Sequence, residues 1–546
     1  MSALAFRQGV RRWIARATTL RYVAALTLVT LAAAAVLGAL LAGPWWWLVA
    51  VPFAAIAALA VADLSQRRHS VLRNYPVLGH LRFLAEAIRP ELQQYFVELD
   101  YDGRPFDRDT RTTVYERSKG NRGHEPFGSG RDVYATGAES FVHSMTPARV
   151  PPTPPRVRVG GPECTVPYDM ALLNISAMSF GSLSANAVLA MARGAAAGGF
   201  AMDTGEGGLS EYHLRHGADL IWELGTGYFG ARSADGGFDP AAFADQAAHP
   251  TVRAVELKLS QGAKPGLGGV LPGVKVTAEI AAARGVPARQ TVVSPPFHRV
   301  FSTPRELVTF LARMRDLAGG KPVGIKLCVG SRRDVLAIVK AWRAEGVGPD
   351  FVVVDGSEGG TGAAPLEFLD HVGTPLTEGL ITVNNALVGA GLREQVRVGA
   401  SGKVATGADV VKRLVQGADY TNAARAMMFA VGCIQAQRCH TNTCPTGVAT
   451  QDPRRARALH VPDKATRVRQ LQAGTVASAM EIIAAMGVRH PEQLHPAMLR
   501  RRTEPGVMRT YAEIYDWLAP GELLCEPPAA WAADWAAADP DAFALA

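Results

Sequence analysis

Two long runs of hydrophobic residues lie near the start of the chain. Tyr22–Ala42 and Trp45–Ala62 carry no charged side chain over 21 and 18 positions. A helix of about 20 apolar residues is long enough to cross a lipid bilayer, and Gly43-Pro44 between the runs is a tight break. The pattern predicts a transmembrane hairpin within residues 1–70, with helices over about 22–42 and 45–62.

Basic residues flank this hairpin on both sides. They are Arg7, Arg11, Arg12, Arg16 and Arg21 before it, and Arg67, Arg68 and Arg73 after it. Positive flanks stay in the cytoplasm, so we expect a cell inner (cytoplasmic) membrane protein whose remaining chain faces the cytoplasm. There are two alternatives. A cleaved signal peptide would have a shorter apolar region and no second run, and a soluble fold could bury a helical hairpin.

From about residue 165 the hydrophobic runs become short and end in glycine, serine or charged residues. Helical stretches rich in alanine and leucine separate several of them, for example Pro304–Ala318, Arg333–Ala344 and Ala408–Gln416. We predict eight strands, at Ala171–Ile175, Phe200–Asp203, Ala254–Leu259, Thr291–Val293, Val323–Cys328, Phe351–Asp355, Val396–Gly399 and Asp419–Ala423. Eight strand-then-helix units predict an α/β fold, a (β/α)8 TIM barrel over residues 161–500. A doubly wound sheet is the alternative, but the G-x-G-x-x-G entry to a first helix is missing.

The other regions are less regular. Residues 71–160 form a mixed, polar lead-in, with helix-like spacing from Leu81 to Phe96 and four prolines within Pro151–Pro155. Residues 501–546 form a C-terminal tail. The chain has 546 residues and a net charge of +8, which is not gathered on a basic, aromatic-rich face, so we expect no nucleic-acid partner. The 6 cysteines are too few for a disulfide framework, which indicates a reducing compartment.

Small residues gather where the predicted strands end, which is where TIM barrels carry their chemistry. Main-chain N–H groups can approach an anion closely at such positions. We therefore predict a phosphate cradle from two glycine-rich loops. Its members are Gly359, Gly360, Thr361 and Gly362 in one loop and Gly399, Ser401 and Gly402 in the other. The alternative for any one loop is that its glycines only allow a tight turn.

Two lysines, Lys258 and Lys326, fall inside predicted strands. An apolar strand tolerates a lysine only if the ammonium group meets a negative partner or water. We expect Lys326 to point into the barrel mouth, where a flavin ring that gains negative charge on reduction would be such a partner. The alternative is that the end of the side chain reaches solvent.

Three cysteines follow the last predicted strand, in the loop 432–447. Cys433, Cys439 and Cys444 have the spacing C-x5-C-x4-C and are followed by Pro445. Clustered thiolates suit an iron–sulfur cluster or zinc. His440 could complete a zinc site, but it directly follows Cys439 and is awkwardly placed.

Several strings of residues resemble the synthase domain of glutamate synthase. They begin at Ser176 (SAMSFGSLS), Thr204 (TGEGG), Lys258 (KLSQGAKPG), Glu358 (EGGTGA) and Gly432 (the cysteine loop). The resemblance is closest to short single-chain proteins that lack the glutaminase domain. It implies FMN at the barrel mouth and a 3Fe–4S cluster held by the three cysteines. It also implies that reduced FMN converts 2-iminoglutarate, formed from 2-oxoglutarate and ammonia, to L-glutamate.

The resemblance also assigns residues. The oxoacid site falls on Gly181, Ser182, Glu206, Lys264 and Arg284, and Ala177, Met178 and Ser179 join the expected cofactor-binding set. Lys264 and Arg284 are the cations expected for a dicarboxylate, and Glu206 could orient the imine or relay a proton. On residues alone, Arg284 could equally be a solvated residue at a helix end. Electrons are expected from ferredoxin or another donor protein, since no dinucleotide motif is present.

Two positions depart from the family pattern. Leu267 replaces a glutamate and Val270 a polar residue in the loop after Lys264. Lost polar contacts change substrate discrimination, so another amine or oxoacid is an alternative, for example in the synthesis of an N-alkylglutamate. A membrane-tethered redox carrier is a further, non-enzymatic alternative. With no glutaminase domain expected, ammonia or an amine would come from solution or a partner.

Overall fold

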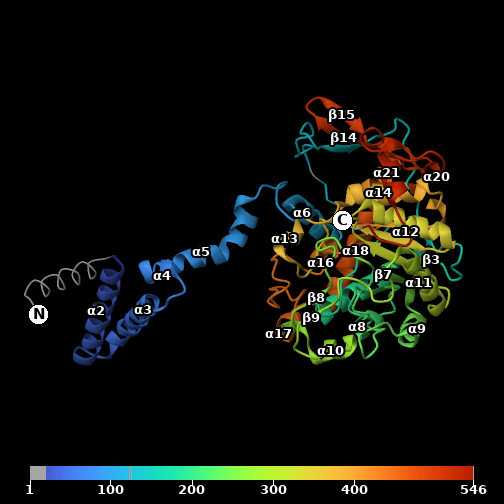
Figure 1. The fold of residues 1–546 in the computed structure, drawn as a ribbon. Helices are drawn as coiled ribbons and strands as arrows, with labels where there is room; N and C mark the ends of the chain where they lie inside the picture. Colours follow the sequence, from blue (N-terminus) through green and yellow to red (C-terminus); the bar gives the residue numbers. More distant parts are fainter. Residues whose placement is uncertain (1–19, 122, 125, 545–546) are drawn as a thin grey trace, which may run out of the picture. The chain divides into compact units, whose positions relative to one another are not determined.

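The computed structural model describes residues 20–121, 123–124 and 126–544. The chain divides into two compact units, one up to Glu98 and one from Leu99 onward. Figure 1 traces both units along the sequence. The second unit contains the barrel.

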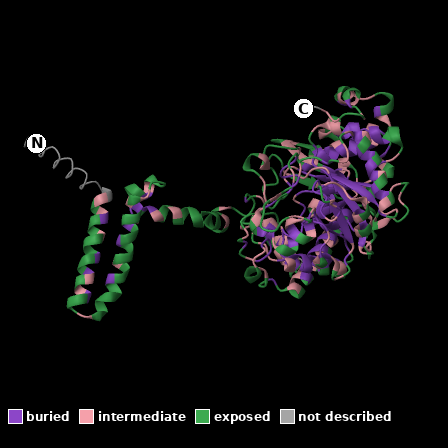
Figure 2. Cartoon of the chain, turned by 60° about the horizontal axis from the view of Figure 1, so that its bottom comes forward, coloured by how far each residue is buried: buried purple, intermediate pink, exposed green. Residues whose placement is uncertain are grey.

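The first unit is helical. It consists of α2 (Leu20–Leu41), a 3-10 turn (Pro44–Trp46), α3 (Trp47–Ser65), α4 (Ser70–Asn74), α5 (Gly79–Leu92) and a π-helical turn (Gln93–Val97). Alanines Ala35, Ala39 and Ala50 pack α2 against α3. Both helices are long and apolar enough to cross a membrane, and most of their side chains are exposed (Figure 2).

Eight parallel strands close into a barrel in the order β10-β11-β12-β13-β4-β5-β6-β7. They are β4 (Leu173–Ile175), β5 (Met202–Asp203), β6 (Leu220–Leu224), β7 (Val252–Lys258), β10 (Val323–Leu327), β11 (Phe351–Asp355), β12 (Arg397–Ser401) and β13 (Tyr420–Ala423). The strands are buried almost throughout, as the purple centre of Figure 2 shows. The predicted TIM-type barrel is therefore confirmed.

Helices connect the strands and cover the barrel. They are α7 (Ala185–Gly198), α8 (Glu211–Leu214), α9 (Pro240–Ala248), α10 (Ala278–Arg284), α11 (Pro304–Leu317), α12 (Arg332–Glu345), α13 (Leu366–Leu369), α14 (Leu376–Gly389), α15 (Gly407–Val415) and α16 (Arg425–Ala430). Their starts follow local rules. Thr303 and Glu306 form a capping box before the apolar stripe of α11, and Pro304 takes the first turn, where its missing N–H costs nothing.

One predicted strand is wrong and one was missed. Thr291–Val293 is not a barrel strand: β9 (Val292–Val293) pairs antiparallel with β8 (Val270–Leu271) in a two-stranded hairpin outside the barrel. The missing barrel strand is β6, whose sequence LIWEL carries Glu223 in an otherwise apolar run. Glu223 interrupts the apolar run on which the strand prediction depends. Acidic residues are seldom fully buried unless they are paired, so the sequence did not indicate a buried strand here.

A second hairpin, β2 (Val157–Val159) with β3 (Tyr168–Met170), closes the N-terminal end of the barrel. Val159 and Met170 pack with Ile221, Phe351 and Tyr420 from the barrel strands. This packing forms an apolar floor, so the open end of the barrel is its C-terminal end.

Further elements surround the barrel. They are α6 (Arg108–Ser118), α17 (Pro453–Ala456), α18 (Val461–Ala485), α19 (Tyr511–Ile514), α20 (Glu522–Cys525) and α21 (Ala529–Ala537), with β1 (Glu139–Phe141), β14 (Leu499–Glu504) and β15 (Val507–Thr510) in one sheet. The tail packs on α12: Asp534 pairs with Arg332, whose guanidinium lies over the buried Trp531 ring.

Candidate functional site

Charged side chains occupy the inner face of three neighbouring strands. Glu256 and Lys258 lie two residues apart on β7, so they share a face of the strand. Parallel pairing sets Glu223 of β6 beside Glu256, and Lys326 of β10 beside Lys258. All four are buried. The register thus brings two acidic and two basic side chains together inside the barrel.

The two lysines are paired with carboxylates. Lys326 Nζ lies 2.8 Å from Glu223 Oε2, and Lys258 Nζ lies 2.6 Å from Glu206 Oε2 and 3.9 Å from Glu223 Oε1. Burial alone would lower the pKa of Lys326, but neighbouring carboxylates, Glu223 first, raise it well above its ordinary value. Neither lysine reaches solvent, which excludes that alternative.

Glu206 lies at the centre of the barrel mouth, on the glycine-rich loop after β5. The surrounding space admits only glycine, because a Cβ at Gly269 would lie 2.3 Å from Glu206 Oε1 and one at Gly225 would lie 3.0 Å from Oε2. Burial tends to raise the pKa of Glu206, but the nearby charges of Lys258, Arg284 and Lys264 lower it. Glu206 is therefore a carboxylate at neutral pH.

Arg284 and Lys264 bring two further buried cations to Glu206. Arg284 ends α10 but is only 4% exposed, so the solvated helix-end alternative is wrong. Its Nη2 donates to the main-chain oxygen of Phe180 at 3.1 Å, while its Nε has no acceptor among the described residues. Burial lowers the pKa of Lys264, and the Glu206 charge opposes this shift. Three cations face one carboxylate, which leaves two positive charges for an anion.

The loop after β4 packs against this group. Gly181 has a φ of 103°, and a Cβ there would lie 3.3 Å from Arg284 Nη2, so the position requires glycine. Ser179 Oγ donates to Ser182 Oγ at 3.0 Å. Ala177 and Met178 precede it in the same loop, and Met178 is buried. The structure thus brings the predicted oxoacid residues Gly181, Ser182, Glu206, Lys264 and Arg284 to one region of the mouth.

The glycine-rich loops meet on the opposite part of the rim. Gly356 N donates to the main-chain oxygen of Ser401 at 3.0 Å, and Ser401 Oγ lies 3.1 Å from Ser176 Oγ. Gly402 has a φ of 141°. The loop with Gly359, Gly360, Thr361 and Gly362 reaches the substrate side, since a Cβ at Gly362 would lie 4.0 Å from Ser182 Oγ. These contacts bring the two glycine-rich loops next to the loop after β4.

A half-buried arginine supports this cradle. Arg425, the first residue of α16, donates to the main-chain oxygen of Glu358 at 2.7 Å. A Cβ at Gly360 would lie 2.9 Å from Arg425 Nε, so glycine allows the loop to approach the guanidinium. Small residues beside a half-buried cation fit a phosphate group. Sequence reasoning missed Arg425, although its place just after the last barrel strand was a usable signal.

Gly399 does not belong to the rim. It lies in the middle of β12, where a Cβ would meet the Tyr420 ring at 2.7 Å inside the barrel. The prediction placed it at the mouth because it ended the strand at Gly399, two residues too early. Its glycine makes room for the Tyr420 side chain, and Ser401 takes the rim position.

The cysteine loop is held in an unusual backbone conformation. Gln435, Gln437 and Asn442 all have positive φ values, of 59°, 53° and 64°. Such non-glycine residues need outside contacts to persist. Gln435 Oε1 accepts from the main-chain N–H of Phe106 at 3.2 Å, and Tyr115 donates to the main-chain oxygen of Cys433 at 2.8 Å. Elements before the barrel thus fix the loop.

The three thiols lie close enough for each to influence another. Burial raises the pKa of Cys433 to about 12, and the charges of Cys439 and Cys444 add to the shift. At Cys444 burial also acts upward, but hydrogen bonds from Ala449 and Thr446 outweigh it and lower the pKa. In the described part of the chain, three possible metal-ligating atoms lie within 4.8 Å of one another only at Asp203, Glu223 and Glu256. The three sulfurs of Cys433, Cys439 and Cys444 are therefore farther apart than that. A single tetrahedral zinc, with bonds of about 2.3 Å, would hold three sulfurs closer than that, so the wider spacing suits a cluster better.

Arg111 of α6 provides a second test of this fit. It is buried, and its Nε and Nη2 have no partner among the described residues. Its positive charge acts to lower the pKa of Cys433, against the larger upward effect of burial. A buried guanidinium without an acceptor favours a negative group beside it, and a cluster ligated by three thiolates is such a group. Nothing in the local sequence of α6 distinguished Arg111 from its exposed neighbours.

The region from Ala171 to the end of α18 also has known relatives. Residues 166–489 match the family model described as the conserved region in glutamate synthase. The glutamate synthase large subunit-like protein YerD of Bacillus subtilis is 38% identical over 500 residues, which cover 84% of this chain and 95% of YerD. An archaeal glutamate synthase (NADPH) of Methanocaldococcus jannaschii is 35% identical, over 59% of this chain and 60% of that protein. A ferredoxin-dependent glutamate synthase of Cyanidium caldarium is 39% identical, over 36% of this chain and 12% of that protein.

Proposed function

The chain belongs to the glutamate synthase family and is an oxidoreductase of the class that acts on CH–NH2 groups, and we propose that it forms L-glutamate from 2-oxoglutarate and ammonia. FMN would lie at the barrel mouth, and a 3Fe–4S cluster would be held by Cys433, Cys439 and Cys444. The observation that carries the proposal is the group of three buried cations around Glu206. Its two excess positive charges match a dicarboxylate.

Arg284 and Lys264 would bind the two carboxylates of 2-oxoglutarate. The Nε–H of Arg284 is free among the described residues to donate to an incoming oxygen, and the guanidinium can bind a carboxylate in a fork. Phe229, whose ring centre lies 5.0 Å from the guanidinium, restricts its position. Burial strengthens each of these charged contacts, because the local dielectric constant is low.

Glu206 would act at the nitrogen end of the substrate. It is ionised and held 2.6 Å from Lys258, so it can accept a hydrogen bond from ammonia or from the imine N–H groups. FMN, when bound, supplies the hydride that reduces the carbon–nitrogen double bond. Gly359, Gly360, Ser401 and Arg425 would hold its phosphate, and Lys326 and Lys258 would face its ring.

Reduced ferredoxin or another donor protein would supply the electrons through the cluster. The names of the relatives include both a ferredoxin-dependent and an NADPH-dependent enzyme, so the choice of a donor protein rests on the lack of a G-x-G-x-x-G strand-to-helix turn in the sequence.

The deciding experiment is an anaerobic half-reaction. The protein carrying its cofactors is reduced chemically and then mixed with 2-oxoglutarate and ammonium. We expect flavin reoxidation together with glutamate formation, and neither when ammonium is omitted. The matched variant Lys264→Met should need much more 2-oxoglutarate for the same rate. The proposal fails if no pairing of an oxoacid with an amine reoxidises the flavin.

One observation favours a second candidate, in which the same cofactors act on a different amine or oxoacid. Leu267 and Val270 follow Lys264 in the same loop and are 38% and 40% exposed. Apolar side chains there suit an alkyl group better than they suit ammonia. Reoxidation by methylamine with 2-oxoglutarate, but not by ammonium, would select this candidate.

We also propose that the first unit anchors the chain in the inner membrane. Besides α2 and α3, helix α5 exposes an apolar stripe at Leu81, Leu84 and Ile88, spaced three and four residues apart. Such an amphipathic helix next to a hairpin suits the bilayer surface. Asp63 at the end of α3 fixes the start of α5, since its carboxylate lies 2.9 Å from His80 Nε2.

A further inference from the structure

Below the mouth, three carboxyl groups gather in the barrel interior. Asp203 of β5, Glu223 of β6 and Glu256 of β7 each place one oxygen within 4.8 Å of the other two. They are 3%, 2% and 1% exposed. Nothing in the proposed substrate or phosphate contacts uses Asp203 or Glu256, so this group needs its own explanation.

The charges in this group do not balance if all three carboxyls are ionised. Lys326 is the cation inside the group, 2.8 Å from Glu223 Oε2 and 3.9 Å from Glu256 Oε1. Its ammonium occupies the position that a metal ion would need, which argues against a metal site. Three buried negative charges against one positive charge are costly in a low-dielectric interior, and the cost is removed when a carboxyl keeps its proton.

Asp203 and Glu256 are the pair that keeps the proton. Burial, followed by the charge of Glu223, raises the pKa of Asp203. Burial, followed by the charge of Asp203, raises the pKa of Glu256 well above its ordinary value. The interaction with Asp203 raises the pKa of Glu256, whereas the interaction with Glu256 lowers the pKa of Asp203, which assigns the proton to Glu256. Glu223 is the member that is paired with Lys326.

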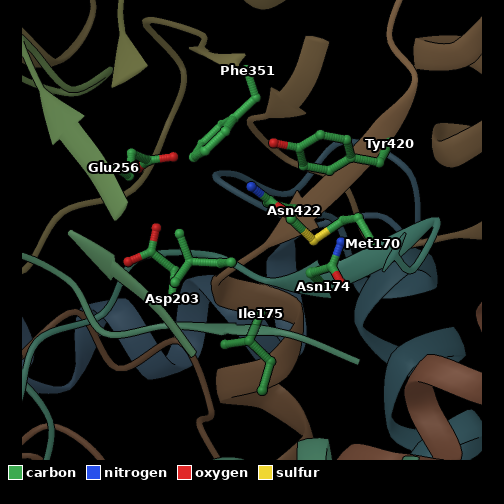
Figure 3. A pocket seen from close by; sticks show the side chains of 9 residues that line it. Met170, Asn174, Ile175, Asp203, Glu256, Phe351, Tyr420 and Asn422 are labelled. Carbon is green, nitrogen blue, oxygen red and sulfur yellow. The ribbon is translucent and has the colours of Figure 1, made fainter. Parts of the chain in front are cut away.

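The surroundings of the pair favour a stored proton. Asp203 and Glu256 face a small cavity of about 10 Å³, which they line together with Asn174, Asn422 and Tyr420 (Figure 3). A space of that size holds about one water molecule. Asp355 on β11 is the next carboxyl, and its Oδ2 accepts from Gly262 N at 2.7 Å. Burial raises the pKa of Tyr420 as well, so the phenol adds no charge.

A short route connects this pair to the mouth. Glu223 lies beside the pair and has its Oε1 3.9 Å from Lys258 Nζ. Lys258 Nζ donates to Glu206 Oε2 at 2.6 Å. The route from Glu256 to Glu206 therefore runs through Glu223 and then Lys258.

We propose that Asp203 and Glu256 store one proton inside the barrel and supply it through Glu223 and Lys258 to Glu206 during the reaction. The supply half of this proposal rests on the proposed function. Ammonia and the oxoacid first form a carbinolamine. Lys258 gives a proton to the Glu206 carboxylate. The C–O bond of the carbinolamine then breaks with the electron pair on oxygen, the nitrogen lone pair forms the C=N bond, and the hydroxyl takes that proton from Glu206 to leave as water.

The remaining transfers restore the acid at each position. Glu256 gives its proton to Glu223, and Glu223 passes a proton to Lys258, which restores the ammonium group of Lys258 and leaves Glu206 as the carboxylate. Bulk water later returns one proton to the pair, so the cycle conserves protons and involves no oxidation. Glu256 and Asp203 do not touch the substrate and act only through Glu206.

The stored proton can be seen without activity. Infrared spectra of the full-length protein at about pH 8, well above the ordinary pKa of carboxyl groups, should contain the carbonyl-stretch band of a protonated carboxyl that shifts in D2O. We expect Glu256→Gln to remove this band and Asp203→Asn to shift or remove it. Glu211→Gln, on the exposed surface, is the matched control and should leave the band unchanged. A band unaffected by both interior variants would overturn the store.

The supply is tested by kinetics of the same variants. Glu256→Gln should lower kcat about tenfold or more, as loss of a general acid does, and flatten the alkaline limb of the pH profile. The KM for 2-oxoglutarate should change less than about twofold, because the binding cations are untouched. Unchanged kcat with a lost band would overturn the supply. A wild-type protein inactive with every oxoacid and amine would overturn the proposed function and the supply, while the band would still decide the store.

Discussion

The buried ammonium group of Lys275 donates a hydrogen bond to the main-chain oxygen of Cys439 at 3.3 Å. The same group donates to the main-chain oxygen of Ser182 at 2.6 Å and of Ala449 at 3.5 Å. Ser182 follows the first barrel strand, whereas Cys439 and Ala449 follow the last. One side chain therefore joins the predicted substrate loop to the cysteine loop, and sequence reasoning did not identify it.

Lys275→Met should lower the free energy of unfolding by about 2 kcal/mol. The variant keeps an apolar stem but leaves buried carbonyl oxygens without a donor, and one unpaired buried group costs about 1–3 kcal/mol. Chemical denaturation of the full chain measures the effect. Lys119→Met, which removes only an exposed ion pair with Glu116, should change stability by less than about 1 kcal/mol. Equal effects of the two variants would argue against a structural role for Lys275.

Arg284→Lys should raise the KM for 2-oxoglutarate about 10- to 100-fold. Lysine cannot bind a carboxylate in a fork, and a hydrogen bond to a charged group contributes about 1.5–3 kcal/mol. Steady-state kinetics with saturating ammonium provide the measurement. Arg299→Lys, at an exposed position, should leave KM unchanged. A fall in kcat alone, with KM intact, would mean that Arg284 does not bind the oxoacid.

Cys439→Ser should abolish the low-temperature EPR signal of an oxidised three-iron cluster. The cluster needs all three thiolates, and a serine hydroxyl is a poor soft-metal ligand. Cys525→Ser is the control, because Cys525 is exposed on α20, and its spectrum should match the wild type. If the signal survives in Cys439→Ser, the ligand assignment is wrong.

Stability should fall as pH decreases from about 6.5 to about 4. Burial lowers the pKa of His213 to about 4, whereas an unfolded histidine has a pKa of about 6.5. The folded ring stays neutral, with Nδ1 accepting from Ser210 N at 3.3 Å. In this pH window only the unfolded chain gains the proton, which removes up to about 3 kcal/mol of the stability present above pH 6.5.

Denaturant unfolding at about pH 7.5 and about pH 4.5 checks this dependence. His213→Asn should flatten it, although His298, whose pKa burial also lowers to about 4, will retain part of the slope. His143→Asn, at an exposed position, should leave the slope unchanged. A wild-type protein equally stable at both pH values would contradict the assignment.

Washing cell membranes with alkaline carbonate should leave the full-length protein in the pellet if α2 and α3 span the bilayer. Leu31→Arg, near the middle of α2, should release part of it, since an arginine at a helix centre costs about 2.5–3.5 kcal/mol on insertion. Val133→Arg, on an exposed loop of the second unit, should not. Release of the wild-type protein by carbonate would favour a peripheral or soluble form.

Local patterns predicted the barrel but not its interior contacts. Strands such as Phe351–Asp355 are recognisable because every residue is apolar up to the final acid. β6 escaped recognition because Glu223 is paired with Lys326, about a hundred residues away, and only that pairing makes a buried carboxylate tolerable. The prediction of a barrel strand at Thr291–Val293 was wrong because three β-branched residues suit an exposed hairpin as well as a barrel strand.

In the candidate site, too, the residues that depend on contacts with distant parts of the chain were not predicted. Glu206, Lys264 and Arg284 were predicted from the family resemblance, and Gly205 and Gly207 marked the loop of Glu206. Arg111, Lys275 and Arg425 were not, because each acquires its role from a partner far along the chain. A lone cation on a helix looks the same in the sequence whether it is exposed or buried, and only the fold distinguishes the two.

The hairpin of β2 and β3 closes the N-terminal end of the barrel, so the barrel is open at its C-terminal end. Val159 and Met170 seal the floor, so under the proposed function ammonia, oxoacid and product would all pass the rim near Ser182 and Gly362. A product molecule must therefore leave before the next substrate molecule can reach Glu206. The product should therefore compete with the oxoacid for entry, and we expect product release to be the rate-limiting step of turnover.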